Sequence, residues 1–221
     1  MLPMKTGLPA RALKIVPYLS PEEVQQLCGG CRGRHRDRDT LLILVLFQTG
    51  LRISEALSLT VGHLSRQPGA LEVLGKGGKP RLVACPAALT HRLKAYAFDR
   101  GLKPADRLFP IGRKRAWQII GAAAAHAGLG KRVYPHLFRH SGAIERLRQT
   151  GNPRALQLHL GHASPLMTMR YLSTLTAEEA LRITRRSASR TEPAAPPQPP
   201  GARPLTPGPA GVSGPRPPIP A

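Results

Sequence analysis

Signals that start and end helices recur along the first 186 residues of the chain and divide them into short segments. The strongest start is Ser-Pro-Glu-Glu at 20–23, where a serine N-cap, a proline at the first helical position and a glutamate at the third form a capping box. Gly50, Gly101 and Gly161 each follow an apolar stretch and should end a helix. This pattern predicts a mainly helical protein.

The predicted elements form one fold class, mainly α with a small antiparallel β-sheet (α+β). The helix after Asp39 is apolar nearly all round, which predicts a buried core helix. Two runs, 70–74 and 81–85, are typical of strands, and the glycine-rich turn between them predicts a hairpin. We expect helices over about 21–28, 40–49, 87–100, 113–127, 136–149 and 153–160, a further helix that the chain enters through a turn at Arg52, a short helix from Ser164 that carries Tyr171, and a last helix over 176–186.

Three local expectations concern helix ends and the core. Gly29 and Gly30 should end the first helix. The stretch 32–38 should then form a basic loop, whose four arginines contact phosphate groups or solvent without reading sequence. Trp117 should lie in the core with the two isoleucines that follow it.

The positive charge of the chain favours a polyanionic partner. Lys and Arg number 33 against 12 Asp and Glu, which gives a formal net charge of +21. Only three basic residues follow Ser187, so most of this charge lies in the part that is predicted to fold. Nucleic acid is the first candidate. No apolar run approaches the ~20 residues of a spanning helix, and no signal-peptide core follows the N-terminus, so we expect a cytosolic protein.

The cysteines do not predict a metal site or a disulfide framework. There are three, Cys28, Cys31 and Cys85, and an odd number in a cytosolic chain argues against paired bridges. Cys28 and Cys31 form a CxxC, but a zinc site would need a second pair of ligands at finger-like spacing, which the sequence lacks. We therefore expect small residues at a helix end, and no metal or cofactor.

The two ends of the chain differ from the middle. Residues 1–16 are basic without a clear period and predict a loose arm. Of the 24 prolines, 12 lie in 191–221 among glycine and alanine. This composition predicts a disordered or polyproline tail over 187–221. The expected folded domain therefore covers 17–186.

A set of polar residues has the spacing of a phosphoryl-transfer site. Arg139 follows His136 by 3 residues, so both share one face of a helix. Tyr171 follows His162 by 9 residues, which leaves room for a turn and a short helix. Together they supply cations for phosphate oxygens, a base, and a phenol that can attack phosphorus. Arg52 lies between buried apolar residues, one turn before a glutamate, which favours an oriented guanidinium.

These motifs together resemble the tyrosine recombinases, or phage integrase family. The matching stretches, in family order, are Thr49 to Glu55, Gly75-Lys76-Gly77, His136-x-x-Arg139, Leu160-Gly161-His162, and Tyr171. The resemblance covers about 17–186 and implies the family's catalytic-domain fold. The helical N-terminal domain of most members has no counterpart here, so the chain resembles single-domain members such as the fimbrial-switch invertases.

The resemblance implies a role for each residue. Tyr171 attacks the scissile phosphate and forms a 3′-phosphotyrosyl link. Arg52 and Arg139 hold the non-bridging oxygens, for which guanidinium forks are well suited. His140 is expected to be structural. The covalent link conserves the phosphodiester energy, so neither ATP nor a metal is required.

The remaining roles concern proton transfer and support. Lys76 protonates the 5′-oxygen leaving group, with Lys79 as the rival for that role. His136 acts as base or proton carrier, and His162 hydrogen-bonds the phosphate. Glu55 steadies the site and does not react.

The resemblance also implies partners and leaves alternatives open. The implied reaction is site-specific DNA recombination by integration, excision, inversion or resolution. Double-stranded DNA is the expected partner, bound by a homo-tetramer in which the last helix docks on a neighbour, with a possible accessory DNA-bending protein. The alternatives are a type IB topoisomerase, which uses a similar set of residues, and a non-catalytic DNA-binding protein that kept the fold.

Overall fold

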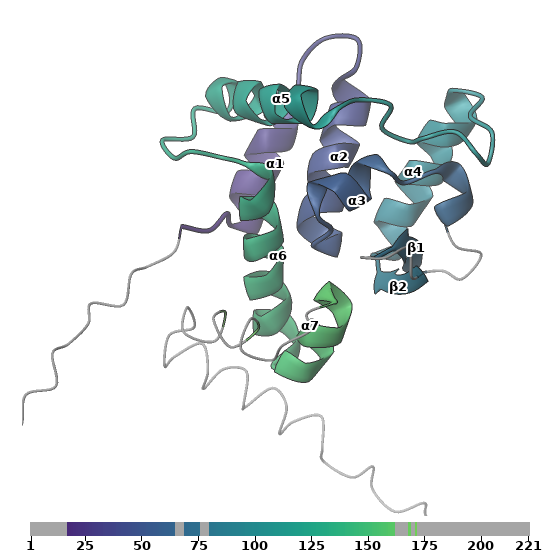
Figure 1. The fold of residues 1–221 in the computed structure, drawn as a ribbon. Helices are drawn as coiled ribbons and strands as arrows, with labels where there is room; N and C mark the ends of the chain where they lie inside the picture. The colour runs from purple at the N-terminus through teal and green to yellow at the C-terminus, as the bar shows by residue number, and fades with distance from the viewer. Residues whose placement is uncertain (1–16, 65–68, 76–79, 162–167, 169–170, 172–221) are drawn as a thin grey trace, which may run out of the picture.

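The computed structural model describes residues 17–64, 69–75, 80–161, 168 and 171. Their elements confirm the predicted class, with helices and one two-stranded antiparallel sheet (Figure 1). In chain order they are α1 (Pro21–Gly30), α2 (Arg36–Thr49), α3 (Ile53–Leu57), the 3-10 helix η1 (Val61–His63), β1 (Ala70–Leu74), β2 (Pro80–Ala84), α4 (Ala87–Asp99), α5 (Arg113–His126), α6 (Pro135–Thr150) and α7 (Pro153–Leu160).

Helix α2 is the centre of the fold. It packs against α1, α3, α4 and α6, and Figure 1 shows it between α1 and α6 on one side and α4 on the other. Its side chains are buried on nearly every side, as the sequence predicts, with Leu42 and Ile43 fully enclosed. Gly50 follows in the left-handed conformation (φ 64°), so the chain turns sharply into α3. This turn carries Arg52.

Helix α6 crosses α2 at very close range. Gly142 lies against the Phe47 carbonyl, so closely that a β-carbon at Gly142 would overlap the oxygen. Phe138, which lies one turn earlier on α6, is fully buried. The Ser141 hydroxyl accepts a hydrogen bond from the Leu19 amide at 2.7 Å, which ties the segment before α1 to the same helix.

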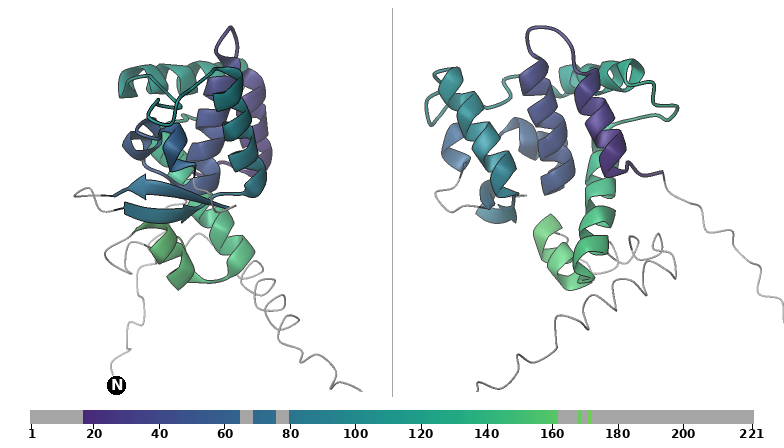
Figure 2. Two further views of the ribbon diagram at one scale, coloured as in Figure 1. Left: turned by 90° about the vertical axis from the view of Figure 1, so that its right-hand side faces the viewer. Right: turned by 180° about the vertical axis from the view of Figure 1, so that it is seen from behind.

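The hairpin lies beside α7 at one edge of the molecule (Figure 2). Its register pairs Val73 with Arg81 and Leu74 with Pro80, so the tip begins at Gly75. Val73 and Val83 are buried on the face that packs on the core, while Leu82 is exposed on the other face. The hairpin tip at 76–79 lies outside the described residues.

A second, smaller apolar cluster joins α6 to α7. It is separate from the main core and includes one residue of the candidate site. Its buried members are Ala143, Ile144, Leu147, Leu156, Leu160 and Tyr171. Tyr171 has helical backbone, while the predicted start of its helix at Ser164, the predicted last helix and the predicted tail lie outside the described residues.

Two predictions of the first helices are wrong. Helix α1 runs through both glycines to Gly30, because Gly30 packs against the Ala123 carbonyl of α5 and only glycine fits there. The expected basic loop is shorter than predicted, since α2 begins at Arg36. Arg38 does not face solvent or phosphate; it is buried and pairs with Asp39 at 2.8 Å.

The prediction that Trp117 lies in the core is also wrong. Its side chain is 45% exposed, while Ile119 and Ile120 are buried as expected. The indole ring lies near the ring of Tyr134, with centroids 6.2 Å apart and planes 12° apart. Trp117 therefore makes an aromatic contact at the surface and does not lie in the core.

The close crossing of α2 and α6 predicts the effect of Gly142→Ala. The added methyl group must push the two helices apart, so the free energy of unfolding should fall by about 1–3 kcal/mol. Gly121→Ala in α5 is the matched control, because nothing lies within 4 Å of the new β-carbon. The control should gain about 0.5–1 kcal/mol from helix propensity. Urea unfolding measures both, and equal effects would contradict the packing described here.

Candidate active site

The turn between α2 and α3 holds Arg52 in place. Arg52 is the N-cap of α3, and its amide donates to Glu55 Oε2 at 2.9 Å. Its Nη1 donates to Glu55 Oε1 at 3.0 Å, while 46% of the side chain is exposed. The guanidinium is therefore held by Glu55 at one side, as the sequence predicts, while its other side is open to solvent.

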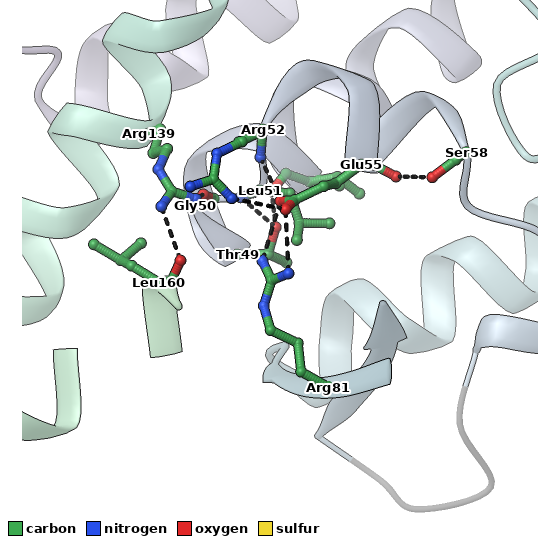
Figure 3. Close-up of polar contacts among 10 residues, drawn as sticks. Thr49, Gly50, Leu51, Arg52, Glu55, Ser58, Arg81, Arg139 and Leu160 are labelled. Carbon is green, nitrogen blue, oxygen red and sulfur yellow. Dashed lines mark hydrogen bonds and ion pairs between the residues drawn. The ribbon is translucent and has the colours of Figure 1, made fainter. Parts of the chain in front are cut away.

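Arg81 of β2 holds the same carboxylate from the opposite side. Its Nη1 and Nη2 donate to Oε1 and Oε2 of Glu55, both at 3.1 Å (Figure 3). The sequence analysis missed this residue. The available signal was the alternation of the strand, because Arg81 shares a face with Val83 and Cys85, which are both buried.

The carboxylate of Glu55 stays ionised at neutral pH. Burial by itself raises its pKa, but the hydrogen bonds from Arg81 and Arg52 outweigh burial and lower the pKa below 4.5. Glu55 is 7% exposed and thus forms a buried anion shared by two arginines. The three groups together carry one net positive charge.

Arg139 lies beside this cluster and is almost fully buried. Its Nη1 donates to the Gly50 carbonyl at 2.6 Å and its Nη2 to the Leu160 carbonyl at 2.8 Å (Figure 3). Burial and then the charge of Arg52 lower the pKa of its guanidinium, which still remains protonated at neutral pH. Arg139 thus joins the Arg52 turn to the end of α7.

Two histidines of α6 extend the site. His136, in the first turn, is exposed, and burial of part of its ring, followed by the charges of Arg139 and Arg52, lowers its pKa. It is therefore neutral at pH 7 and able to accept a proton. His140 lies one turn later, and its pKa is lowered by burial and by His136.

Tyr171 reaches the same region from the second cluster. It is 7% exposed, and its ring centroid lies 5.2 Å from that of His140, with the planes tilted by 40°. This ring contact places Tyr171 beside α6, next to the residue that follows Arg139, and an ionised phenolate there would raise the pKa of Arg139. The structure thus brings Arg52, Glu55 and Arg139 together, with His136 and His140 on the same helix as Arg139 and Tyr171 against His140.

Three predicted site residues, Lys76, Lys79 and His162, lie outside the described residues. The residues that precede two of them are described. Gly75 lines a hollow of about 500 Å³ together with Arg52, and Gly161 lies against Arg81. The same hollow is also lined by Ser54, Glu55, Ser58 and Leu74.

His159 is a second group that the sequence analysis missed. Burial, followed by the charges of Arg146 and other arginines, lowers its pKa to about 4, despite a hydrogen bond to the Thr49 backbone. The bond connects α7 to the end of α2. No sequence signal identified it, because a histidine within a short amphipathic helix fits an exposed position equally well.

The described residues offer no obvious place for a metal ion. Nowhere among them do three His, Cys, Asp or Glu side chains gather at ligand distance. The three thiols are unpaired with one another, and burial raises the pKa of Cys28 to about 11. The helices of the described part are also too short or too polar to span a bilayer.

Comparison with known sequences points in one direction. Residues 17–178 match the sequence model of the Phage integrase family. A tyrosine recombinase of Pseudothermotoga lettingae is 32% identical over 171 residues, which cover 75% of this chain and 59% of the relative. XerD of Mycobacterium leprae is 33% identical over 196 residues, covering 79% and 61%. The chain thus spans about three fifths of the length of these relatives.

Solved structures share the fold. XerH recombinase in a post-cleavage complex with its difH substrate matches with a TM-score of 0.64 and 26% identity, covering 79% of this chain and 53% of that one. The catalytic domain of bacteriophage HP1 integrase matches with a TM-score of 0.57 and 25% identity, covering 80% and 95%. The second match covers a catalytic domain almost completely.

The buried state of His159 predicts a loss of stability in acid. Its pKa is 6.5 when unfolded and about 4 when folded, so the unfolded chain takes up the proton first as the pH falls. Between pH 6.5 and 4 the free energy of unfolding should therefore fall, by on the order of 3 kcal/mol from this residue.

Urea unfolding at several pH values measures this loss. His159→Gln, which does not titrate, should flatten the curve between pH 6.5 and 4. His136 and His140 act in the same direction, so some slope should remain. An unchanged curve in the variant would contradict the buried neutral state.

Proposed function

The chain belongs to the Phage integrase family, and we propose that it is a site-specific DNA recombinase that acts through a 3′-phosphotyrosyl intermediate. One observation carries the proposal beyond family membership. Arg52 and Arg139 are both anchored at the turn after α2, and the Tyr171 ring contacts His140, the residue that follows Arg139. Two cations and a phenol at one place suit nucleophilic attack on a phosphodiester.

In the proposed reaction, the Tyr171 oxygen attacks phosphorus and the bond from phosphorus to the 5′-oxygen breaks. The phenol proton passes to a base, for which the neutral imidazole of His136 is suited. Lys76 gives a proton to the leaving oxygen, with Lys79 as the alternative donor. Attack by a 5′-hydroxyl of a second duplex then reverses these steps and restores the phosphodiester.

The arginines stabilise the charge that develops on the phosphate oxygens. Arg52 is half exposed and keeps guanidinium donors that are not used by Glu55. Arg139 gives two of its five N–H donors to the Gly50 and Leu160 carbonyls, so it adds positive charge beside Arg52 and keeps donors for the phosphate oxygens. His162 is proposed to add a hydrogen bond to the same oxygens. No ATP or metal ion takes part in these steps.

The proposed partner is double-stranded DNA in the cytoplasm, at the nucleoid. The net charge of +21 supports it, as does the similarity to XerH, whose solved complexes contain its difH substrate. A homo-tetramer on DNA, contact through the last helix and an accessory DNA-bending protein are proposed from the family. The boundaries at 16/17 and 186/187 and the role of the Pro-rich tail stay predictions.

Tyr171→Phe should abolish covalent attachment to DNA. The substrate is a pool of end-labelled duplexes with randomised sequence around a nick, so that the short 5′-hydroxyl fragment diffuses away and the adduct is trapped. Denaturing gels measure the adduct, and sequencing of the attached DNA shows whether a site is preferred. An adduct formed equally by the Phe variant would show that Tyr171 is not the nucleophile.

Sequence preference in the same experiment separates the alternatives. An adduct without preference, together with relaxation of any supercoiled plasmid, would favour a type IB topoisomerase. Tight DNA binding without an adduct would favour a non-catalytic DNA-binding protein.

Arg52→Ala should slow adduct formation by about 10²–10³-fold in single-turnover experiments, the typical loss of one oxyanion donor. Arg100→Ala is the control, because Arg100 lies at the end of α4, over the Tyr96 ring, outside the site. The rate is measured at saturating protein, so a change in DNA affinity does not enter it. Equal rates for the two variants would contradict the role of Arg52.

A further inference from the structure

Arg81 touches each of the three segments that lead to the predicted catalytic groups. It lies on β2 directly after the hairpin tip, it pairs with Glu55 below Arg52, and it packs against Gly161, the residue before His162. Only 20% of its side chain is exposed. None of the roles derived above uses Arg81.

We propose that Arg81 is a positioning residue, which orients Arg52 through Glu55 and holds the hairpin and the end of α7 in register with the arginine pair. The inference rests on the proposed function and deepens it. Arg81 does not touch the phosphate in this role, and it acts through the groups that do.

Each oxygen of the Glu55 carboxylate accepts two hydrogen bonds, one of them from Arg81. Oε1 accepts from Nη1 of Arg52 and Nη1 of Arg81, at 3.0 and 3.1 Å. Oε2 accepts from the Arg52 amide and Nη2 of Arg81, at 2.9 and 3.1 Å. The planar fork of Arg81 thus fixes the plane of the carboxylate, and this plane sets the direction of the Arg52 guanidinium.

Arg81 also balances the charge of the trio that it forms with Glu55 and Arg52. Without Arg81, the single negative charge of Glu55 would be matched by Arg52 alone within this trio, and the carboxylate would compete with a phosphate for that guanidinium. With Arg81 present, the anion is shared and Arg52 keeps part of its charge for a ligand. A lysine supplies the same charge but only a point contact.

Arg81 also lies against the end of α7. A β-carbon built at Gly161 would lie 3.3 Å from Arg81 Nε and 3.6 Å from Cδ and Cζ. Nε is buried, and no described residue accepts a hydrogen bond from it. Gly161 adopts φ 64°, so glycine both turns the chain and makes room for the guanidinium. Arg81 therefore contacts both Glu55 and the end of α7.

Arg81 also links the hairpin to α3 at a defined position of the ladder. Arg81 pairs with Val73, one position inside the last pair of the ladder, Leu74 with Pro80. The ion pair with Glu55 therefore pins the strand just below the tip that carries Lys76 and Lys79. A hairpin anchored at this point has little freedom to shift relative to α3.

The test is single-turnover adduct formation with the nicked duplex pool, at saturating protein. Arg81→Gln should slow the reaction by about 10–100-fold, the cost of a misplaced reacting group, and should leave the equilibrium affinity for the duplex within about twofold. Arg81→Lys should restore part of the rate, because it keeps the charge and loses the fork. Arg100→Gln is the charge-matched control and should react at the wild-type rate.

A double-mutant cycle with Glu55→Gln tests the route of the effect. If Arg81 acts through Glu55, the rate loss of Arg81→Gln should shrink in the Glu55→Gln background. Fully additive losses, or a wild-type rate for Arg81→Gln, would overturn the inference. Circular dichroism checks that each variant folds. If Arg81→Gln does not fold, Arg81→Lys takes its place in the double-mutant cycle with Glu55→Gln, and the same outcomes support or overturn the inference.

The design separates this inference from the proposed function. A wild-type protein that forms no adduct, or one that Tyr171→Phe does not abolish, overturns the proposed function and the role of Arg81 with it. A Tyr171-dependent adduct that forms at the same rate with Arg81→Gln overturns the role of Arg81 alone.

Discussion

The arrangement of the site depends on the two hydrogen bonds that the buried guanidinium of Arg139 donates to backbone carbonyls. A charge in the interior is costly unless its donors are satisfied. Here the acceptors are the Gly50 and Leu160 carbonyls, at the C-terminal ends of α2 and α7. Helix C-termini carry unpaired carbonyls and partial negative charge, so two of them stabilise one cation well. The same contact brings the Arg52 turn and the segment leading to His162 together.

Much of this arrangement follows from local sequence. The capping box at 20–23 and the helix ends at Gly50 and Gly161 lie where the sequence predicts them. The held Arg52 was also foreseeable, because Glu55 follows one turn later. These features depend on neighbours along the chain, and short-range patterns describe such neighbours adequately.

The errors share a physical cause, which is contact between segments far apart in sequence. Arg81 meets Glu55 across 26 residues, and no local pattern contains that distance. Gly30 continues α1 because Ala123 of α5 covers it, although its sequence resembles a helix stop. Trp117 is a large apolar residue of the kind that often lies in a core, yet its position beside Tyr134 leaves it half exposed. Tertiary packing overrode local propensity in each case.

The separation of Tyr171 from the main core has an energetic consequence. Its side chain belongs to the small cluster between α6 and α7, whereas Arg52 and Glu55 are fixed by the main body. Withdrawing one aromatic side chain from that cluster costs about 1.5–3 kcal/mol, well below the global stability of a typical domain. Such partial openings occur far more often than complete unfolding. The phenol of Tyr171, the proposed nucleophile, is thus held separately from Arg52 and Glu55, and it can leave its cluster and return while those two residues keep their positions.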